Sequence, residues 1–312
     1  MLGKTAGGLF WMFRALERSE NTARLVEAGF RFTLTNSASS EEEWASVVGT
    51  SGDLETYRAK NDDFDTVRVV AFLLRDRDNP SSVLSLIEQA RSNARMVRTA
   101  LTREVWEAVN ESWITLSEAL SRRTADKDLT SILGLIRRQS ALVRGATHGT
   151  MMRTEEFDFA RIGTFLERAD NTARILDVKY HLLLPSVAHV GSTLDNVQWE
   201  AILDSVAARG AYRHHVDAAP SPRGIADFLI NDPRLPRSLA FCVDKVVNNL
   251  RYLEPGHGRM ACHDMAQQLA DALANETIDD VFDRGLHETI EGFIVDNNRL
   301  ATQIEADFRF NG

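Results

Sequence analysis

A segment of twelve residues occurs twice in this chain of 312 residues. Residues 16–27 read LERSENTARLVE, and residues 166–177 read LERADNTARILD. Seven of the twelve positions are identical, and the acidic positions that differ exchange Glu for Asp. A long-range repeat of this kind is typical of a chain built from two similar units, and it constrains the fold more than any other feature of the sequence.

Two further blocks match between the same parts of the chain and in the same order. Their spacing drifts from 150 to 156 residues, as small loop insertions produce. Three matching blocks in one order are not typical of unrelated amphipathic helices, so we interpret the chain as two halves, residues 1–153 and 154–312. The additional correspondences are Trp44 with Trp199, Tyr57 with Tyr212, and residues 72–97 with residues 228–253.

Helical patterning dominates both halves, and no strand-like alternation bounded by turn signals stands out. Two long helices are expected over residues 8–34 and 157–184. Turn or cap signals at 35–43, 78–82, 217–223, 232–236 and 254–256 separate the other helices. The sequence therefore predicts an all-α fold, an internally duplicated helical bundle whose two pseudo-twofold-related halves pack as one domain over residues 1–312. Among the shorter helices, one is expected to begin at residue 44 and another to end at residue 253. The others are expected over residues 81–101, 102–120, 129–147, 260–274 and 278–308.

Composition excludes some classes of partner. The formal net charge is -9, which does not favour nucleic-acid binding. No apolar run approaches the roughly 20 residues that span a bilayer, so no membrane association is expected. The two cysteines, Cys242 and Cys262, have neither metal-site spacing nor a disulfide pattern. We expect a cytoplasmic protein without a metal site or a cofactor of its own.

Four predicted helices carry an acid, then a small polar residue, then an arginine, at positions i, i+4 and i+7. On a helix these positions fall within an arc of about 60°. We therefore expect four polar ladders that face one another around a pseudo-twofold axis. Their members are Glu17, Asn21 and Arg24; Glu167, Asn171 and Arg174; Glu88, Ser92 and Arg95; and Asp244, Asn248 and Arg251.

Three interpretations of these ladders remain open. They could be surface ion pairs, although helix phase places apolar residues such as Leu16 beside the acids. They could form a buried network that holds the halves in register, which requires every charge to be paired. They could also line a cleft in which arginines hold a carboxylate or phosphate group. In that case Arg24, Arg95, Arg174 and Arg251 would bind the anion, and Glu17 or Glu167 would act as acid or base.

Two other segments carry polar residues that could contribute to a site. His148, Thr150 and Arg153 stand near glycines where the halves join, and they form either a loop that faces the cleft or a helix end and turn. Residues 279–283 read DDVFD, a pattern that can bind Mg²⁺ and diphosphate. Because Thr277 precedes them at a helix start, we favour helix capping for these acids.

Taken together, the motifs resemble those of the alpha-E family, which takes its name from a Glu-Arg motif. Glu17-Arg18 and Glu167-Arg168 match that motif, and the resemblance extends over essentially the whole chain. The other matching segments are 8–34, 78–82, 90–95, 106–110, 149–153, 165–170, 228–229 and 235–238.

The resemblance implies an α-helical protein whose genes accompany a circularly permuted ATP-grasp protein and a transglutaminase-like peptidase. It implies an accessory component of an ATP-grasp-linked system that forms peptide or amide bonds, with ATP and Mg²⁺ held by the ATP-grasp partner. It assigns no reaction to the Glu-Arg residues. The alternative is a stand-alone helical enzyme that binds an acidic or phosphorylated intermediate in a polar cleft between the halves.

Overall fold

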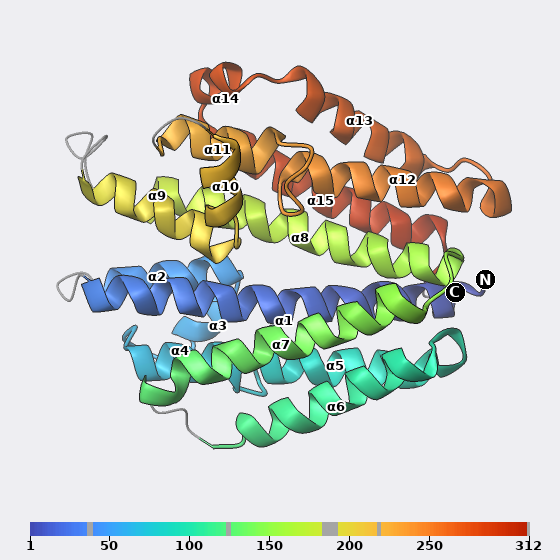
Figure 1. Cartoon of the computed structure of the whole chain (residues 1–312), viewed down its shortest axis with the longest axis horizontal. Coiled ribbons are helices and arrows are strands. Elements are labelled where there is room, and N and C mark those ends of the chain that lie inside the picture. The colour runs from blue at the N-terminus through green and yellow to red at the C-terminus, as the bar shows by residue number, and fades with distance from the viewer. Residues whose placement is uncertain (36–39, 123–125, 183–192, 217–219, 311–312) are drawn as a thin grey trace.

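The computed structural model describes residues 1–35, 40–122, 126–182, 193–216 and 220–310. Within these ranges the chain forms helices and turns and contains no strand, which confirms the all-α prediction (Figure 1). The helices are α1 (Gly3–Thr35), α2 (Ser40–Ser51), α3 (Leu54–Arg58), α4 (Thr66–Leu74), α5 (Val83–Met96), α6 (Arg103–Ala119), α7 (Asp126–Thr150), α8 (Glu155–Leu182), α9 (Thr193–Ser205), α10 (Arg209–His215), α11 (Pro222–Asn231), α12 (Leu239–His257), α13 (Ala261–Asn275), α14 (Ile278–Arg284) and α15 (Leu286–Asp307), with a 3-10 turn η2 (Arg98–Ala100).

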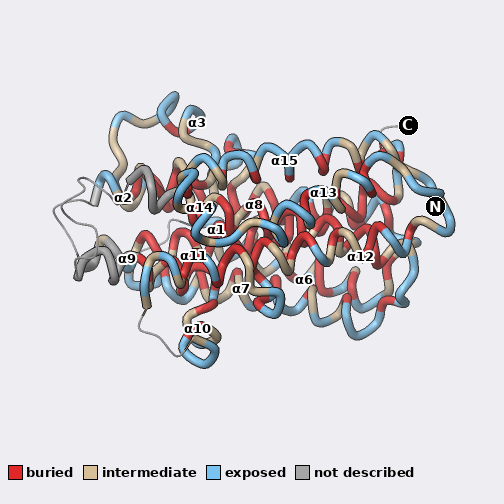
Figure 2. The backbone as a smooth tube through the Cα atoms, turned by 90° about the horizontal axis from the view of Figure 1, so that it is seen from above, coloured by how far each residue is buried: buried red, intermediate tan, exposed pale blue. Residues whose placement is uncertain are grey.

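Helices α1 and α8 run side by side through the centre of the molecule (Figure 1). On one side α1 packs against α5 and α7, and on the other side α8 packs against α12 and α15. Buried residues are concentrated along these two helices in Figure 2. A helix that is covered on all sides cannot turn its charged residues to water, so the charges of α1 and α8 require partners inside the protein.

The backbones of α1 and α8 approach each other closely at Gly163. A Cβ atom at this position would lie 2.3 Å from the carbonyl oxygen of Phe10. Aromatic side chains after α15 pack beside this contact, with ring centroids 5.3 Å apart for Phe10 and Phe310 and 4.9 Å apart for Phe159 and Phe308. The glycine thus sets how near the two central helices can lie.

Serine caps begin the two helices that flank the central pair. The hydroxyl of Ser82 accepts a hydrogen bond from the Ser85 amide at 3.2 Å and starts α5. The hydroxyl of Ser238 accepts one from the Phe241 amide at 3.0 Å and starts α12. Each cap satisfies one of the donors that a helix start leaves without an intrahelical partner, so the expected start near residues 81 and 82 is confirmed.

Several boundaries differ from the sequence prediction. The helix expected over 278–308 is divided into α14 and α15 at Gly285, whose φ of 113° is incompatible with a helix. Helix α12 passes through Pro255 and ends at Gly258, where φ is 78°. Parts of the connections expected at 35–43 and 217–223, and the expected helix end at 184, lie outside the described residues. None of the helices described is both long and apolar enough to cross a membrane.

Replacement of Gly163 by alanine is expected to force α1 and α8 apart and to lower the free energy of unfolding by about 1–3 kcal/mol, the usual cost of overpacking. Gly145 in α7 is the matched control, because a Cβ there meets nothing within 4 Å. Gly145→Ala should be neutral or stabilising by up to about 1 kcal/mol. Denaturant unfolding of both variants checks the expectation, and equal stabilities would contradict the close approach.

Candidate functional site

The two Glu-Arg dipeptides pair with each other across the α1–α8 contact. Arg168 donates to the Glu17 carboxylate from Nε at 2.8 Å and from Nη2 at 2.9 Å. Arg18 donates to the Glu167 carboxylate from Nε at 2.5 Å and from Nη2 at 3.0 Å. Each dipeptide therefore gives its acid to the arginine of the other dipeptide. Two parallel hydrogen bonds between a guanidinium and a carboxylate fix both distance and orientation.

A further arginine contacts each of these carboxylates. Arg14 donates to Glu167 at 3.0 Å, and Arg237 donates to Glu17 at 3.2 Å. Glu17 and Glu167 are only 4% and 3% exposed. Burial by itself raises the pKa of each acid, but the positive charges of the surrounding arginines outweigh burial and hold both pKa values below the usual range. Both glutamates are therefore ionised and enclosed near neutral pH.

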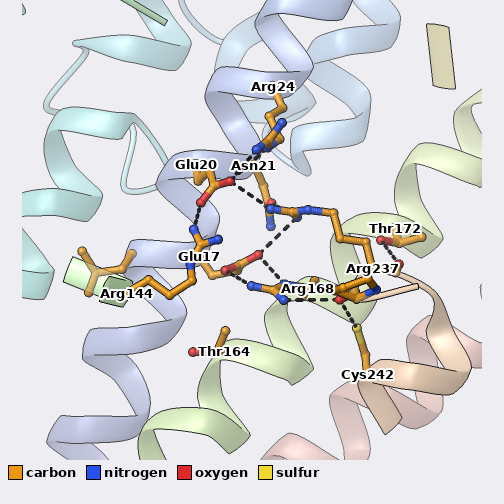
Figure 3. Close-up of polar contacts among 12 residues, drawn as sticks. Glu17, Glu20, Asn21, Arg24, Arg144, Thr164, Arg168, Thr172, Arg237 and Cys242 are labelled. Atoms are coloured by element: carbon orange, nitrogen blue, oxygen red, sulfur yellow. Dashed lines mark hydrogen bonds and ion pairs between the residues drawn. The ribbon is translucent and has the colours of Figure 1, made fainter. Parts of the chain in front are cut away.

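Arg237, in the segment before α12, extends this network along α1 (Figure 3). Its guanidinium also donates to Asn21 Oδ1 at 3.0 Å and to Glu20 Oε1 at 2.9 Å. Glu20 pairs in addition with Arg24, at 2.8 Å, and with Arg144 of α7. Burial lowers the pKa of Arg237 to about 10, so the side chain remains charged near neutral pH despite its enclosure. One arginine thus ties the α12 side of the molecule to three residues of α1.

Sequence reasoning did not single out Arg14, Arg144 or Arg237. The sequence pattern combined an acid and an arginine on one helix, whereas each of these arginines contacts an acid on a different helix. Only the match of residues 235–238 to the family segments pointed toward Arg237. Its contacts could not be derived from spacing, because the acids lie more than 200 residues away in the sequence.

The ladders on α5 and α12 do not join this network. Glu88 is exposed and pairs with Arg77 at 2.6 Å. Arg95, Asp244 and Arg251 are exposed as well, and Asn248 is half-buried. The expectation that four ladders face one another is therefore wrong, because α5 and α12 turn their apolar faces inward and their ladders outward. The ladders on α1 and α8 are the two that meet.

His148 and Thr150 form the last turn of α7 rather than a loop. Arg153, just beyond the helix, donates to the His148 carbonyl at 3.0 Å and to the Met151 carbonyl at 3.2 Å, which satisfies carbonyls at the helix end. The Thr150 hydroxyl lies 2.7 Å from that of Thr102 at the start of α6. The helix-end interpretation fits this geometry, and His148 and Arg153 also line a cavity.

This cavity, which we call the basic recess, has a volume of about 870 Å³. It adjoins a small pocket of about 70 Å³ through shared residues His148 and Arg161, and the small pocket reaches Glu17 and Arg168. The basic recess is lined by His148, Arg153, Thr154, Glu155, Phe157, Asp158, Arg161, Lys245, Asn248, Asn249 and Tyr252.

Three cationic side chains, Arg153, Arg161 and Lys245, line the recess together with two carboxylates, Glu155 and Asp158, and the charge of Asp158 acts on Arg161. In the part of the chain that the structure describes, neither Arg153 nor Arg161 forms an ion pair; both guanidinium groups lie over the Phe157 ring, at 3.8 and 5.5 Å from its centroid. Burial and then the charges of Arg161, Arg153 and Arg144 lower the pKa of His148. Burial, Arg153 and Arg168 likewise lower the pKa of Arg161. A site with this potential favours an anion.

Of the acids in residues 279–283, Asp280 caps α14, as expected, and Asp279 lies in the first turn of that helix. The Thr277 hydroxyl accepts from the Asp280 amide at 3.2 Å, and the Asp280 carboxylate accepts from the Thr277 amide at 3.0 Å. Asp279 pairs with Arg223 at 2.6 Å. Across the described residues, no group of three or more His, Cys, Asp or Glu side chains is arranged to hold a metal ion.

Comparison with known families identifies the chain. Residues 1–308 match the model of a family described as "a predicted alpha-helical domain with a conserved ER motif". The chain belongs to the Alpha-E family. No curated protein and no solved structure matches it. Glu17-Arg18 and Glu167-Arg168 are the only Glu-Arg dipeptides in the sequence, so the motif in the Alpha-E description corresponds here to the crossed pairs between α1 and α8.

Neutralising either glutamate is expected to destabilise the protein strongly. Glu17→Gln and Glu167→Gln each leave buried guanidinium groups without their counter-charge, which costs about 3–5 kcal/mol. Glu88→Gln is the matched control, because its ion pair is exposed and should contribute no more than about 1 kcal/mol. Denaturant unfolding measures all three variants. Costs for Glu17→Gln and Glu167→Gln as small as that of Glu88→Gln would show that the crossed pairs do not hold the fold.

The crossed pairs also predict how stability depends on pH. The folded pKa values of Glu17 and Glu167 lie below those of the unfolded chain, so the folded state binds fewer protons. Their stabilisation is fully present above a pH of about 4.5 and is lost as pH falls below it. The unfolding free energy of Glu167→Gln should therefore fall less steeply than that of the natural chain between about pH 5 and pH 3. Parallel curves would contradict this assignment.

Proposed function

We propose that this Alpha-E chain is a helical accessory component of an ATP-grasp-linked system that forms peptide or amide bonds. In this role its basic recess holds the carboxylate or phosphorylated group of the ligase's substrate. The proposal rests on one observation, the two arginines at residues 153 and 161 that line the recess and form no ion pair in the described chain. Amide-bond formation consumes a carboxylate, and arginine binds carboxylate and phosphate groups well.

The proposal includes an internal duplication of the whole domain, with two pseudo-twofold-related halves at residues 1–153 and 154–312. Matched contacts support it. The rings of Tyr57 and Phe72 lie 5.0 Å apart at 84°, and those of Tyr212 and Phe228 lie 5.3 Å apart at 83°. The caps of α5 and α12 and the crossed Glu-Arg pairs also correspond. In this view the Glu-Arg motif locks one half to the other.

An accessory role fits the network better than catalysis by the motif itself. A general acid or base is most effective when its pKa lies near the working pH. Glu17 and Glu167 instead have lowered pKa values and are saturated by arginines. Of the four arginines considered as anion holders, Arg24 is paired with Glu20 and Arg174 with Asp170, and Arg95 and Arg251 are exposed. ATP and Mg²⁺ accordingly belong to the ATP-grasp partner, and a transglutaminase-like peptidase is a second candidate partner in the cytoplasm.

A stand-alone enzyme is the second candidate function, and one residue of the recess favours it. Asp158 lies on α8 in the recess and is only 7% exposed. Burial raises its pKa to about 6, against which the charge of Arg161 acts only in part. A carboxyl group with this pKa can both donate and accept a proton near neutral pH. In this alternative the recess arginines hold an acidic or phosphorylated intermediate while Asp158 transfers the proton.

The decisive test uses the purified chain and a circularly permuted ATP-grasp partner, with ATP, Mg²⁺ and candidate amino acids. Complex formation and amide product are measured together. An accessory component forms a complex and raises ligase turnover, and it has no turnover alone. Conversion of the ligase product by this chain alone, lost in Asp158→Asn, would support the enzyme. If the chain forms no complex and shows no turnover, both functions are refuted.

The recess predicts which substitution weakens the effect. Arg153→Gln combined with Arg161→Gln should reduce stimulation of the ligase by about tenfold or more, because two charge-assisted contacts to the bound anion are lost. Arg77→Gln is the matched control, since Arg77 is exposed and pairs with Glu88 away from the recess. Thermal unfolding verifies that both variants are folded. Stimulation that is equal in the two variants would contradict anion binding in the recess.

A further inference from the structure

A second cavity lies beside Glu167, apart from the basic recess. It has a volume of about 270 Å³ and is bounded by α1, α8, the end of α2 and the segments before α3 and α5. Apart from Leu25 and Gly52, its lining residues are polar or charged. The residues are Arg18, Asn21, Thr22, Leu25, Thr50, Ser51, Gly52, Asp53, Ser81, Glu167, Asp170, Asn171 and Arg174.

Beside Glu17, on the other side of the α1–α8 contact, a side chain of the protein fills the space that corresponds to this cavity. There the guanidinium of Arg237 donates to Glu17, Glu20 and Asn21 (Figure 3). In the repeated sequence these three residues correspond to Glu167, Asp170 and Asn171, which border the second cavity. The same three residue types are thus present twice, but one arginine bridges only the first set. In the second set Glu167 accepts from Arg18 and Arg14, and Asp170 keeps an oxygen without a donor.

At the second cavity, the residue that corresponds to Arg237 in the repeat is Ser81. The two connections share their backbone hydrogen bonds: the Ser82 amide donates to Asn79 at 3.1 Å, and the Ser238 amide donates to Leu235 at 3.0 Å. Each serine then caps the helix that follows. Residue 81 therefore precedes the cap of α5 just as Arg237 precedes the cap of α12. The short side chain of Ser81 acts on Asp53, but it does not bridge Glu167, Asp170 and Asn171 as Arg237 bridges their counterparts.

Several polar atoms at the second cavity lack partners. Asp170 is 5% exposed, and its Oδ1 accepts no hydrogen bond, although its Oδ2 accepts one from Arg174 at 2.7 Å. Oδ2 of Asp53 and Nδ2 of Asn171 are also buried without a partner. Unpaired buried polar atoms are costly, and a ligand that supplies hydrogen-bond donors removes this cost at both carboxylates.

The charges of the lining agree with such a ligand. Three carboxylates, from Asp53, Glu167 and Asp170, face two guanidinium groups, from Arg18 and Arg174. Burial raises the pKa of Asp53, against weaker opposing effects of Ser81, Ser51 and the two arginines, so a nearby cation would stabilise its ionised form.

We propose that this cavity binds the guanidinium or ammonium group of a small basic ligand, in the place that Arg237 occupies beside Glu17. Donors of the ligand meet Asp170 and Asp53. An acidic group on the same molecule can accept from those N–H groups of Arg18 and Arg174 that are not already bonded to Glu167 and Asp170. The site goes beyond the accessory role proposed above, because that role requires an anion in the basic recess. Either site can fail its test without affecting the other.

Ligand binding is tested with matched pairs of probes. Arginine and citrulline share their backbone and differ in the charge of the side-chain head, and lysine supplies the ammonium group. Calorimetry and thermal unfolding should detect arginine or lysine but not citrulline. Agmatine and a short blocked peptide that contains one arginine are then compared. They show whether the bound group comes from a free amine or from a basic side chain of a peptide. Equal binding of arginine and citrulline, or no binding of any basic probe, would overturn the proposal.

Substitutions then locate the site. Ser81→Arg should fill the cavity with the group that Arg237 supplies on the other side, raise the unfolding temperature and abolish binding of the basic probe. Ser81→Ala leaves the cavity open and should retain binding. Asp170→Asn removes a charged acceptor and should weaken binding by about tenfold or more, measured below its unfolding temperature. Unchanged binding in Ser81→Arg would place the ligand elsewhere and overturn the proposal. If Ser81→Arg does not fold, unchanged binding in Asp170→Asn would overturn it instead.

Discussion

The crossed ion pairs between Glu17 and Arg168 and between Arg18 and Glu167 are the interaction on which the rest of the structure depends. Glu17, Glu167 and Arg168 are buried between the two central helices, and only Arg18 is partly exposed, so the carboxylates depend on these arginines rather than on water. Buried pairs of this kind add little net stability compared with an apolar contact, but breaking one of them is costly. Their main effect is therefore to specify one arrangement of α1 against α8, an arrangement that the contact at Gly163 also requires.

This constraint separates the polar groups of the chain into two classes. Around Glu17 the arginines and acids pair with one another, and two arginines without an ion pair, Arg153 and Arg161, lie farther out in the basic recess. Around Glu167 the same lock is present, but the space that Arg237 fills on the first side remains a polar cavity. The locked groups specify how α1 and α8 pack, whereas the groups beside them retain unused binding capacity. The binding proposals for this Alpha-E chain follow from that difference.

Much of this arrangement is predictable from the sequence. Helical period, caps and the repeated segment identify the all-α fold, the two long central helices and both Glu-Arg dipeptides. The ladders on α5 and α12 show the limit, because the spacing i, i+4 and i+7 places three residues on one face without fixing where that face points. The contacts of Arg237 and Arg14 depend on distant segments and could not be derived from local spacing. Similarly, Asp158 carries no motif, and its raised pKa results mainly from burial in the fold, with a smaller contribution from the neighbouring charges of Glu155 and Glu156.

The central claim is that the Glu-Arg motif acts across the two central helices rather than within one. A double-mutant cycle in denaturant unfolding tests it directly, with Glu17→Gln and Arg168→Met alone and together, and with Glu17→Gln and Arg18→Met as the reference cycle. The crossed pair should show a coupling energy of about 1–3 kcal/mol, and the pair within one dipeptide should be additive within about 0.5 kcal/mol. Additivity of the crossed pair, or a larger coupling within the dipeptide, would contradict this account.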